Sequence, residues 1–233
     1  MKLVNRVLYK WGLMPTPEIE EKAYTGLAAY VRDVNMPESF AEKYFKGLIV
    51  REPDITEASR RIGGMVTNYR YVILSNHMEK SADPAEAEQG IVYAPAGARF
   101  KVLGRCHHGE KSAIIMLHLP EEKELWSKIW GATFPHDKKL FARAEAHFKE
   151  KEAEAEPIKA LCTEDWIARC SMPVGMDENA KPHPLEDKKP AAEASATEAA
   201  PAEEAVPAEE TAPAEETAAA PEAEAPAAQE EQI

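Results

Sequence analysis

The chain has 233 residues and a formal net charge of −13, which at first suggests an acidic protein. The charge is unevenly distributed, because residues 190–233 hold twelve Glu and no Asp, Lys or Arg. Removing these twelve from the 41 acidic residues leaves 29 against 28 basic residues, so residues 1–189 are nearly neutral. Their basic residues are not clustered, and the acidic segment would oppose a polyanion. We therefore expect no nucleic-acid partner.

Two regions meet near residue 190. Residues 1–189 are long enough to form a single globular domain with its own core. Residues 190–233 repeat PAEEAV, PAEETA and PAEETA, and their large apolar side chains are only Val206 and Ile233. Such a segment buries too little apolar surface to offset the entropy lost on ordering, so we predict a disordered Ala/Pro/Glu-rich acidic tail.

The cellular location is expected to be the cytoplasm. No apolar run approaches the ~18 residues of a membrane-spanning helix, so we predict no integral membrane segment. Arg6 and Lys10 interrupt the stretch that would have to form the core of a signal peptide. The cysteines Cys106, Cys162 and Cys170 are too few for a disulfide framework, which fits a reducing compartment.

The first third of the domain has a helical pattern. Apolar residues recur at helical spacing over residues 3–14 and again over residues 17–34, where Thr16 is a suitable N-cap. Pro37 can open a third helix that reaches residue 48. Asp54 and Glu57, three residues apart, fit the N-cap and third position of a helix and predict a short helix over residues 54–63.

The middle third changes to a strand pattern. β-Branched and aromatic residues or strict alternation predict strands over residues 66–74, 90–95, 98–106 and 112–120. Residues 76–89 are expected to form a polar loop. Four strands in close succession predict an antiparallel sheet.

The last third returns to helices, with apolar stripes over residues 120–130, 140–148 and 158–167. The predicted fold class is therefore α+β. It consists of a small antiparallel sheet of about four strands, flanked by N-terminal and C-terminal helices and followed by the disordered tail.

The stretch GRCHHGEKS at residues 104–112 gives the strongest signal in the chain for a chemical function, because it gathers side chains that can bind a metal or act in catalysis. Cys106, His107 and His108 are all possible metal ligands, and His77 could complete a site, although no CxxC or HExxH spacing fixes one. Cys106 activated by His108 is a further possibility, as a nucleophile. A polar tip with Gly109 between two alternating apolar runs is more typical of a hairpin turn.

Trp126 and Trp130 are the candidate contacts for a protein partner. They lie four residues apart on a predicted helix, and tryptophan is enriched at interface hot spots. The same spacing also fits a buried core stripe.

Three hypotheses about function follow from the sequence, which leaves the cofactor unknown. The preferred one is an intracellular, nonenzymatic binding or adaptor module, because no catalytic signature occurs. The alternative is a small metal-assisted enzyme with a site of His77, Cys106 and His108 near the 104–112 hairpin. The third is a membrane-peripheral protein held by the basic stripe of Lys2, Arg6 and Lys10 on the N-terminal helix.

Overall fold

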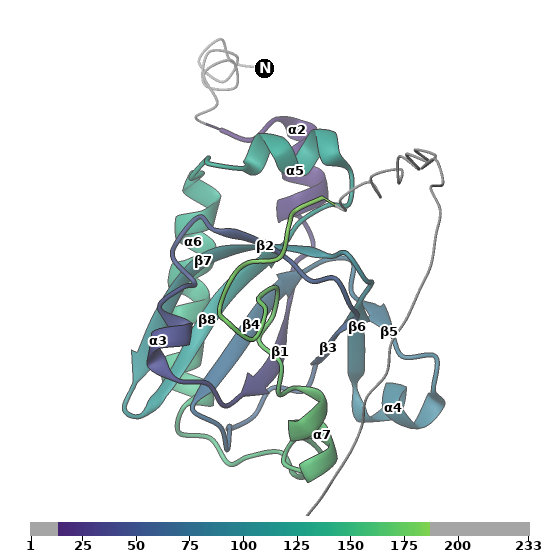
Figure 1. Cartoon of the computed structure of the whole chain (residues 1–233), viewed down its shortest axis with the longest axis vertical. Helices are drawn as coiled ribbons and strands as arrows, with labels where there is room; N and C mark the ends of the chain where they lie inside the picture. Colours follow the sequence, from purple (N-terminus) through teal and green to yellow (C-terminus); the bar gives the residue numbers. More distant parts are fainter. Residues whose placement is uncertain (1–13, 187–233) are drawn as a thin grey trace, which may run out of the picture. The chain divides into compact units, whose positions relative to one another are not determined.

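The computed structural model describes residues 14–186, and one eight-stranded sheet forms its centre (Figure 1). The strands are β1 (Ala28–Val34), β2 (Ile49–Arg51), β3 (Thr56–Ser59), β4 (Tyr69–Ser75), β5 (Glu79–Lys80), β6 (Ile91–Ala94), β7 (Arg99–His108) and β8 (Lys111–His118). The helical segments are α2 (Pro17–Ile19), η1 (Glu20–Tyr24), α3 (Glu38–Ala41), α4 (Pro84–Gln89), α5 (Lys123–Ile129), α6 (Pro135–His147), η2 (Phe148–Glu152), η3 (Lys159–Leu161) and α7 (Glu164–Arg169). The basic N-terminal helix and the acidic tail were predicted for segments that lie outside the described residues, apart from Met14, so both stay predictions.

The strand order across the sheet is β2-β7-β8-β4-β1-β3-β6-β5. β4 runs parallel to β8, and the other pairs of described strands are antiparallel. The prediction of a small antiparallel sheet of about four strands is therefore wrong, because the sheet is mixed and twice as large. Its parallel pair arises because β5, α4, β6 and β7 all lie between β4 and β8, which gives the chain the long crossover that parallel strands require.

The four predicted strands all exist within this larger sheet. Residues 66–74, 90–95, 98–106 and 112–120 contain or overlap β4, β6, β7 and β8. Alternation identified residues 98–106, and apolar runs rich in β-branched or aromatic residues identified the others. The missing strands are β1 and the short β2, β3 and β5, which carry little periodic signal.

The helix predicted over residues 17–34 is helical only as far as Tyr24, and the chain then continues as β1. Thr16 does cap the helical part, since its hydroxyl accepts a hydrogen bond from the backbone N–H of Ile19. Every residue over 31–34 is buried, because β1 lies inside the sheet and both its faces are covered. A strand that is apolar on both faces cannot be distinguished from a helix by spacing alone.

Three other expectations also need correction. The short helix predicted over residues 54–63 is instead β3, and the helix predicted from Pro37 is the four-residue α3. The polar loop predicted over residues 76–89 contains β5 and α4, the latter capped by Asp83. Within the described part of the chain, no helix is long and apolar enough to cross a membrane.

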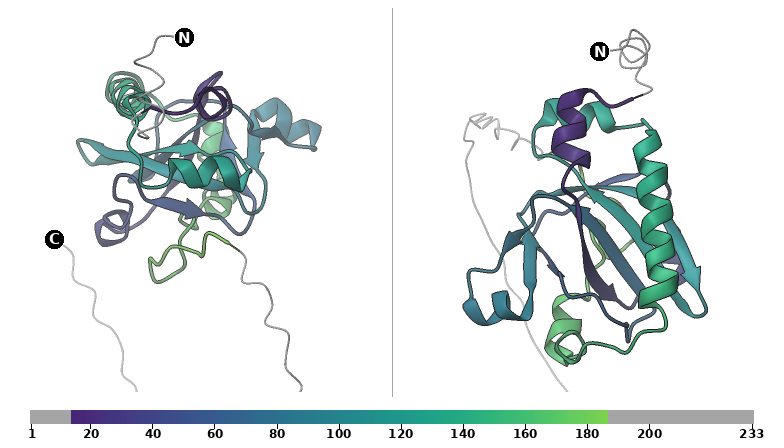
Figure 2. Two further views of the ribbon diagram at one scale, coloured as in Figure 1. Left: turned by 90° about the horizontal axis from the view of Figure 1, so that it is seen from above. Right: turned by 180° about the vertical axis from the view of Figure 1, so that it is seen from behind.

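Different segments cover the two faces of the sheet. On one face, seen from behind in Figure 2, α6 packs against the sheet, and we call this the α6 face. On the opposite face lies the segment after α7, residues 170–183, which we call the C-terminal strap (Figure 1). Its Val174 and Met176 are buried with Tyr44 and Tyr71 in the core on that face, the strap face.

A buried ionic network lies on the α6 face around Arg70 of β4, which is 0% exposed. Arg70 Nε and Nη2 donate to the two carboxylate oxygens of Asp33 at 2.6 and 2.8 Å, and Nη1 donates to Glu152 at 2.7 Å. The carbonyls of Gly63 and Gly64 accept further hydrogen bonds. This buried cation is therefore fully paired, which is what a structural role requires.

Candidate ligand-binding site

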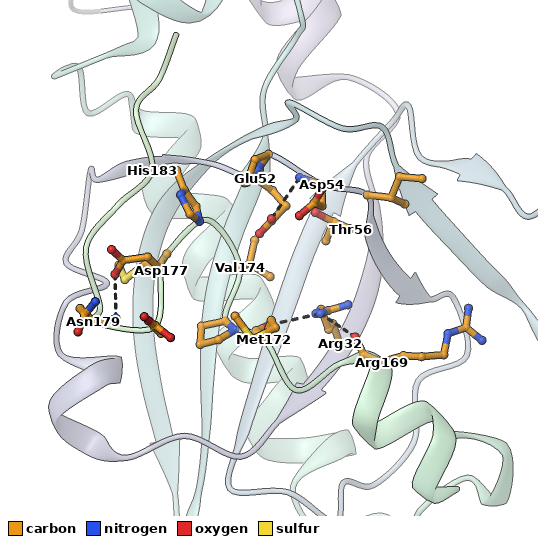
Figure 3. A pocket seen from close by; sticks show the side chains of 15 residues that line it. Arg32, Glu52, Asp54, Thr56, Arg169, Met172, Val174, Asp177, Asn179 and His183 are labelled. Atoms are coloured by element: carbon orange, nitrogen blue, oxygen red, sulfur yellow. Dashed lines mark hydrogen bonds between the residues drawn. The ribbon is translucent and has the colours of Figure 1, made fainter. Parts of the chain in front are cut away.

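A pocket of about 510 Å³ opens between the sheet and the C-terminal strap (Figure 3). Its walls come from β1, from the connection between β2 and β3, from the end of α7 and from the strap. The lining side chains that matter below are Arg32, Glu52, Asp54, Thr56, Arg169 and Asp177. Its volume is within the range of roughly 300–1,000 Å³ that small-molecule sites occupy.

Arg32 of β1 is buried at 6% exposure and lies at one end of this pocket (Figure 3). Its Nη1 donates to the carbonyl of Glu57 at 3.1 Å, and its Nη2 donates to the carbonyls of Arg169 and Met172 at 3.2 and 3.3 Å. Its Nε has no hydrogen-bond partner among the residues that the structure describes. Within residues 14–186, no carboxylate pairs with this guanidinium. A buried cation that is balanced only by neutral carbonyls can still accept an anion.

Thr56, at the start of β3, supplies a second unpaired polar atom. The residue is 1% exposed and lines the same pocket, yet its Oγ1 makes no hydrogen bond within the described structure. A buried polar atom without a partner costs about 1–3 kcal/mol, so such atoms require an explanation. Two of them around one pocket indicate a position where a bound molecule could supply the missing partners.

The strap forms the outer wall of the pocket and is anchored to the core. The hydroxyl of Tyr44 donates to the carbonyl of Val174 at 2.8 Å, and the backbone N–H of Gly175 donates to Glu52 at 2.7 Å. Burial raises the pKa of Tyr44 well above its usual value, so this hydroxyl stays a donor. Gly175 has a φ of +71°, and a Cβ there would come within 2.5 Å of the side chain of Val50. Only glycine lets the strap turn so close to β2.

Acidic side chains also line the pocket. They are Glu52, Asp54, Asp177 and Glu178, and Figure 3 shows Asp177 at the side opposite Arg32. Two backbone N–H groups, those of Lys181 and Asn179, each donate to Asp177 at 2.9 Å and hold the pKa of this carboxyl below its usual value. Asp177 is therefore ionised at neutral pH. The pocket thus has the cation of Arg32 at one end and the carboxylate of Asp177 at the opposite side, which suits a ligand carrying charges of both signs.

Arg169 lines the cationic end, but its charge is already compensated. It forms an ion pair with Glu57 of β3 and another with Glu86 of α4 at 2.9 Å. These carboxylates raise the pKa of Arg169. Arg169 therefore fixes α7 against the sheet, and Arg32 is the arginine of this pocket that lacks an acidic partner.

The predicted metal ligands do not come together. The 104–112 hairpin is confirmed, since His108 pairs with Lys111 across the turn at the tip. The ring of His77 lies 3.9 Å from that of His118, at the other end of β8, and seven residues at ~3.3 Å each place that end roughly 23 Å from the tip. His108 instead contacts Glu154 at 3.0 Å. Among residues 14–186, no group of three or more His, Cys, Asp or Glu side chains could hold a metal ion.

Cys106 is also unsuited to act as a nucleophile. The residue is buried beneath α6, and burial raises the pKa of its thiol to about 11. A thiolate is the reactive form, so this cysteine is unreactive at neutral pH. His107 lies on the opposite face of β7 and contacts Ser112 at 2.7 Å.

The two tryptophans have different environments. Trp126 is 2% exposed and belongs to the core on the α6 face, below the guanidinium of Arg99. Trp130 is 59% exposed at the end of α5. Only Trp130 is therefore placed to contact a partner, and its role stays a prediction.

Comparison with known proteins identifies no family. No family model matches the sequence, and no curated protein matches it. Among solved structures, the type III effector XopAI from Xanthomonas axonopodis pv. citri matches with a TM-score of 0.33 and 18% identity over 43% of this chain and 44% of its own. The ADP-ribosyltransferase HopU1 of Pseudomonas syringae pv. tomato gives 0.34 and 15%, over 43% and 48% of the two chains. C3stau2 from S. aureus, solved with NAD, gives 0.34 and 13%, over 44% and 66%.

These comparisons contradict the preferred hypothesis from the sequence. The prediction of a nonenzymatic binding or adaptor module is wrong, because HopU1 and other structures found are named as ADP-ribosyltransferases, which are enzymes. The matched region spans less than half the length of the first solved structures found. TM-scores near 0.33 assign no activity to this chain, so any function has to be argued from the pocket itself.

Sequence reasoning missed the residues of this pocket. Arg32 lies in AAYVRDV, and a charged residue inside an apolar run is a signal for a buried cation once the run is recognised as a strand. Thr56 lies in a segment that was interpreted as a helix. The strap carries no periodic pattern, so nothing in the sequence indicates that it returns to cover Arg32.

Proposed function

We propose that the Arg32 pocket binds a small molecule that carries a phosphate or similar anionic group and a separate positive charge. The observation that supports this is the buried guanidinium of Arg32, which has an unpaired Nε and no carboxylate partner within residues 14–186. Phosphate oxygens would supply the missing acceptor, because arginine pairs with them in a planar, charge-assisted geometry.

The other features of the pocket narrow the class of ligand. Asp177, at the side opposite Arg32, would face the positive group. Ile55 and Met172 line the pocket although both are more than half exposed, so they offer apolar surface to a ring. A dinucleotide with a positively charged nicotinamide has all three parts, and NAD is also the molecule present in the C3stau2 structure.

The test is isothermal titration of the full-length chain with three related molecules. NAD carries both phosphates and a positive ring, NADH has a neutral ring, and ADP-ribose lacks the ring. We expect NAD to bind at least tenfold more tightly than the other two, because only NAD satisfies both ends of the pocket. Release of nicotinamide is followed in the same samples and would show whether the bound molecule is cleaved.

Two variants connect binding to Arg32. Arg32→Gln should weaken NAD binding at least tenfold, and Arg32→Lys, which keeps the charge, should lose less. Arg60→Gln, an exposed arginine outside the pocket, is the matched control. Equal affinities of folded Arg32→Gln and wild type would exclude this pocket as the site, and so would the absence of binding by all three molecules.

We also propose the cytoplasm as the working compartment. All three cysteines are free thiols, and Cys106 and Cys170 are buried in apolar surroundings. This supports a reducing environment.

A further inference from the structure

A second pocket lies on the α6 face, on the other side of the sheet from Arg32. It has a volume of about 510 Å³ and is formed by β1, β4, the segment that leads into β1, and α6. In the view from behind, β1 is seen beside α6 with no described helix in front of it (Figure 2). We call this pocket the α6 groove.

Small residues create the hollow. Gly26, Ala28 and Ala29 line it from the β1 side, and Ala144 lines it from α6. Larger side chains at these positions would fill the space between strand and helix, as protein cores normally do. The groove is therefore present because four neighbouring positions carry little or no side chain.

Apolar side chains form the walls around these small residues. The largest of them are Leu27, Ile62, Val72, Leu74 and Leu140. Leu27, Ile62 and Leu140 are only partly buried, although all three pack against buried clusters. Their exposed surface remains available for burial against an apolar ligand.

Charge at the rim is positive. Arg143 lines the groove, is exposed, and forms no ion pair within residues 14–186. Glu152 also lines it, but one of its oxygens contacts His147 at 2.8 Å and the other accepts from Arg70 at 2.7 Å. Both carboxylate oxygens of Glu152 therefore already have partners, and Arg143 is left as the cation at the rim that can attract an incoming negative charge.

From this combination we propose that the α6 groove binds a medium-chain carboxylate, with the alkyl chain against Leu27, Leu74 and Leu140 and the carboxylate at Arg143. Twelve carbons occupy about 360 Å³ if each takes roughly the 30 Å³ of a water molecule, which fits within the groove. The site is separate from the Arg32 pocket, so it does not depend on the proposed function.

Laurate, a twelve-carbon carboxylate, is the probe, titrated into the full-length chain below its micelle concentration. We expect saturable binding at one site per chain. Dodecanol has the same chain without charge and should bind at least fivefold more weakly, and dodecyltrimethylammonium should bind weakest. Decanoate is shorter by two methylenes, and at roughly fourfold per methylene it should bind about sixteenfold more weakly than laurate.

Three variants place the ligand. Arg143→Gln should remove the preference for laurate over dodecanol, whereas Lys139→Gln, exposed one turn earlier on α6 and outside the groove, should keep it. Ala144→Leu fills the groove from the helix and should abolish binding of both molecules. Its thermal unfolding is measured beside wild type to show that the domain is folded.

Several outcomes would overturn the proposal. Equal affinity for laurate and dodecanol in wild type would remove the role of Arg143, and binding that persists in folded Ala144→Leu would place the ligand elsewhere. Binding that appears only after removal of residues 1–13 would show that this chain's own segment occupies the groove. The wild-type chain could also fail to bind laurate and form a dimer. If Leu140→Glu then dissociates that dimer, the groove is occupied by a second copy of the chain.

Discussion

Two neighbouring strands of this sheet each bury an arginine, and the two arginines are treated in opposite ways. Arg70 of β4 faces α6 and is held by two carboxylates and two carbonyls. Arg32 of β1 faces the strap, is also buried, and has three carbonyls and an unpaired Nε.

The difference separates a buried charge that is neutralised by the protein's own carboxylates from one that is not. A buried cation costs free energy unless an anion is nearby, and Asp33 and Glu152 provide two for Arg70. Nothing within residues 14–186 provides one for Arg32. Arg70 is therefore paired within the fold, whereas Arg32 has no anionic partner among these residues.

The largest expected effect is on stability at Arg70. Arg70→Met leaves Asp33 and Glu152 buried without their shared cation, so we expect the free energy of unfolding to fall by about 3–5 kcal/mol. Arg32→Met leaves no charge behind and removes only carbonyl contacts, so we expect a loss of about 1–2 kcal/mol. Urea denaturation of both variants beside wild type measures the two losses. Losses of equal size would contradict the conclusion that only Arg70 is neutralised by buried carboxylates.

A second expected effect concerns His118, another buried basic residue without a carboxylate partner. Burial against His77, Phe100 and Ser75 lowers the pKa of His118 from 6.5 to about 3. Unlike Arg32, this side chain avoids an uncompensated charge by remaining neutral. Below pH 6.5 His118 is therefore protonated in the unfolded chain but stays neutral in the folded chain. The free energy of unfolding consequently falls as the pH falls towards 3.

Between pH 7 and pH 5 this contribution amounts to about 2 kcal/mol, because each pH unit below 6.5 is worth roughly 1.4 kcal/mol. Urea denaturation at both pH values measures it. In His118→Gln the free energy of unfolding should change by about 2 kcal/mol less between pH 7 and pH 5 than in wild type, and the remaining change comes from other titrating groups. An unchanged pH profile in His118→Gln would show that His118 is not held neutral.

The smallest expected effect is at Thr56. Thr56→Val keeps the shape of the side chain and removes a buried hydroxyl that has no partner within residues 14–186, so the free energy of unfolding should rise by about 1 kcal/mol. The control is Thr67→Val, because the buried hydroxyl of Thr67 donates to the carbonyl of Tyr69 at 3.0 Å and its loss should cost about 1 kcal/mol. If Thr56→Val costs as much as Thr67→Val, the hydroxyl of Thr56 is satisfied in the folded chain.

The strands that sequence reasoning found either alternate or form a compact apolar run. β7 alternates, β8 is a continuous apolar run, and the predicted hairpin between them is present. β1 was interpreted as a helix because Leu27, Val31 and Val34 also fit helical spacing. A strand inside a sheet with both faces covered gives no alternation, so its identity depends on neighbours that local spacing cannot reveal.

The candidate site depends even more on long-range contacts. Arg32 and Met172 are 140 positions apart, and the hydrogen bond between them exists only when the strap has folded over β1. The sequence-based candidates His77, Cys106 and His108 were chosen by residue type, and the fold places them in different environments. Residue type alone could not distinguish Arg70 from Arg32, because the difference between them lies in their partners.

The position of β8 between β4 and β7 also determines when this domain can fold during synthesis. β4 leaves the ribosome early, but its parallel neighbour β8 ends at His118, so the centre of the sheet is incomplete until that residue has emerged. The strap follows later still, and the pocket closes only after Val174 reaches Tyr44. Pairings this distant in sequence slow folding, because a long loop must close before they form. For much of translation, the unpaired backbone edge of β4 is therefore exposed to other nascent chains and to chaperones.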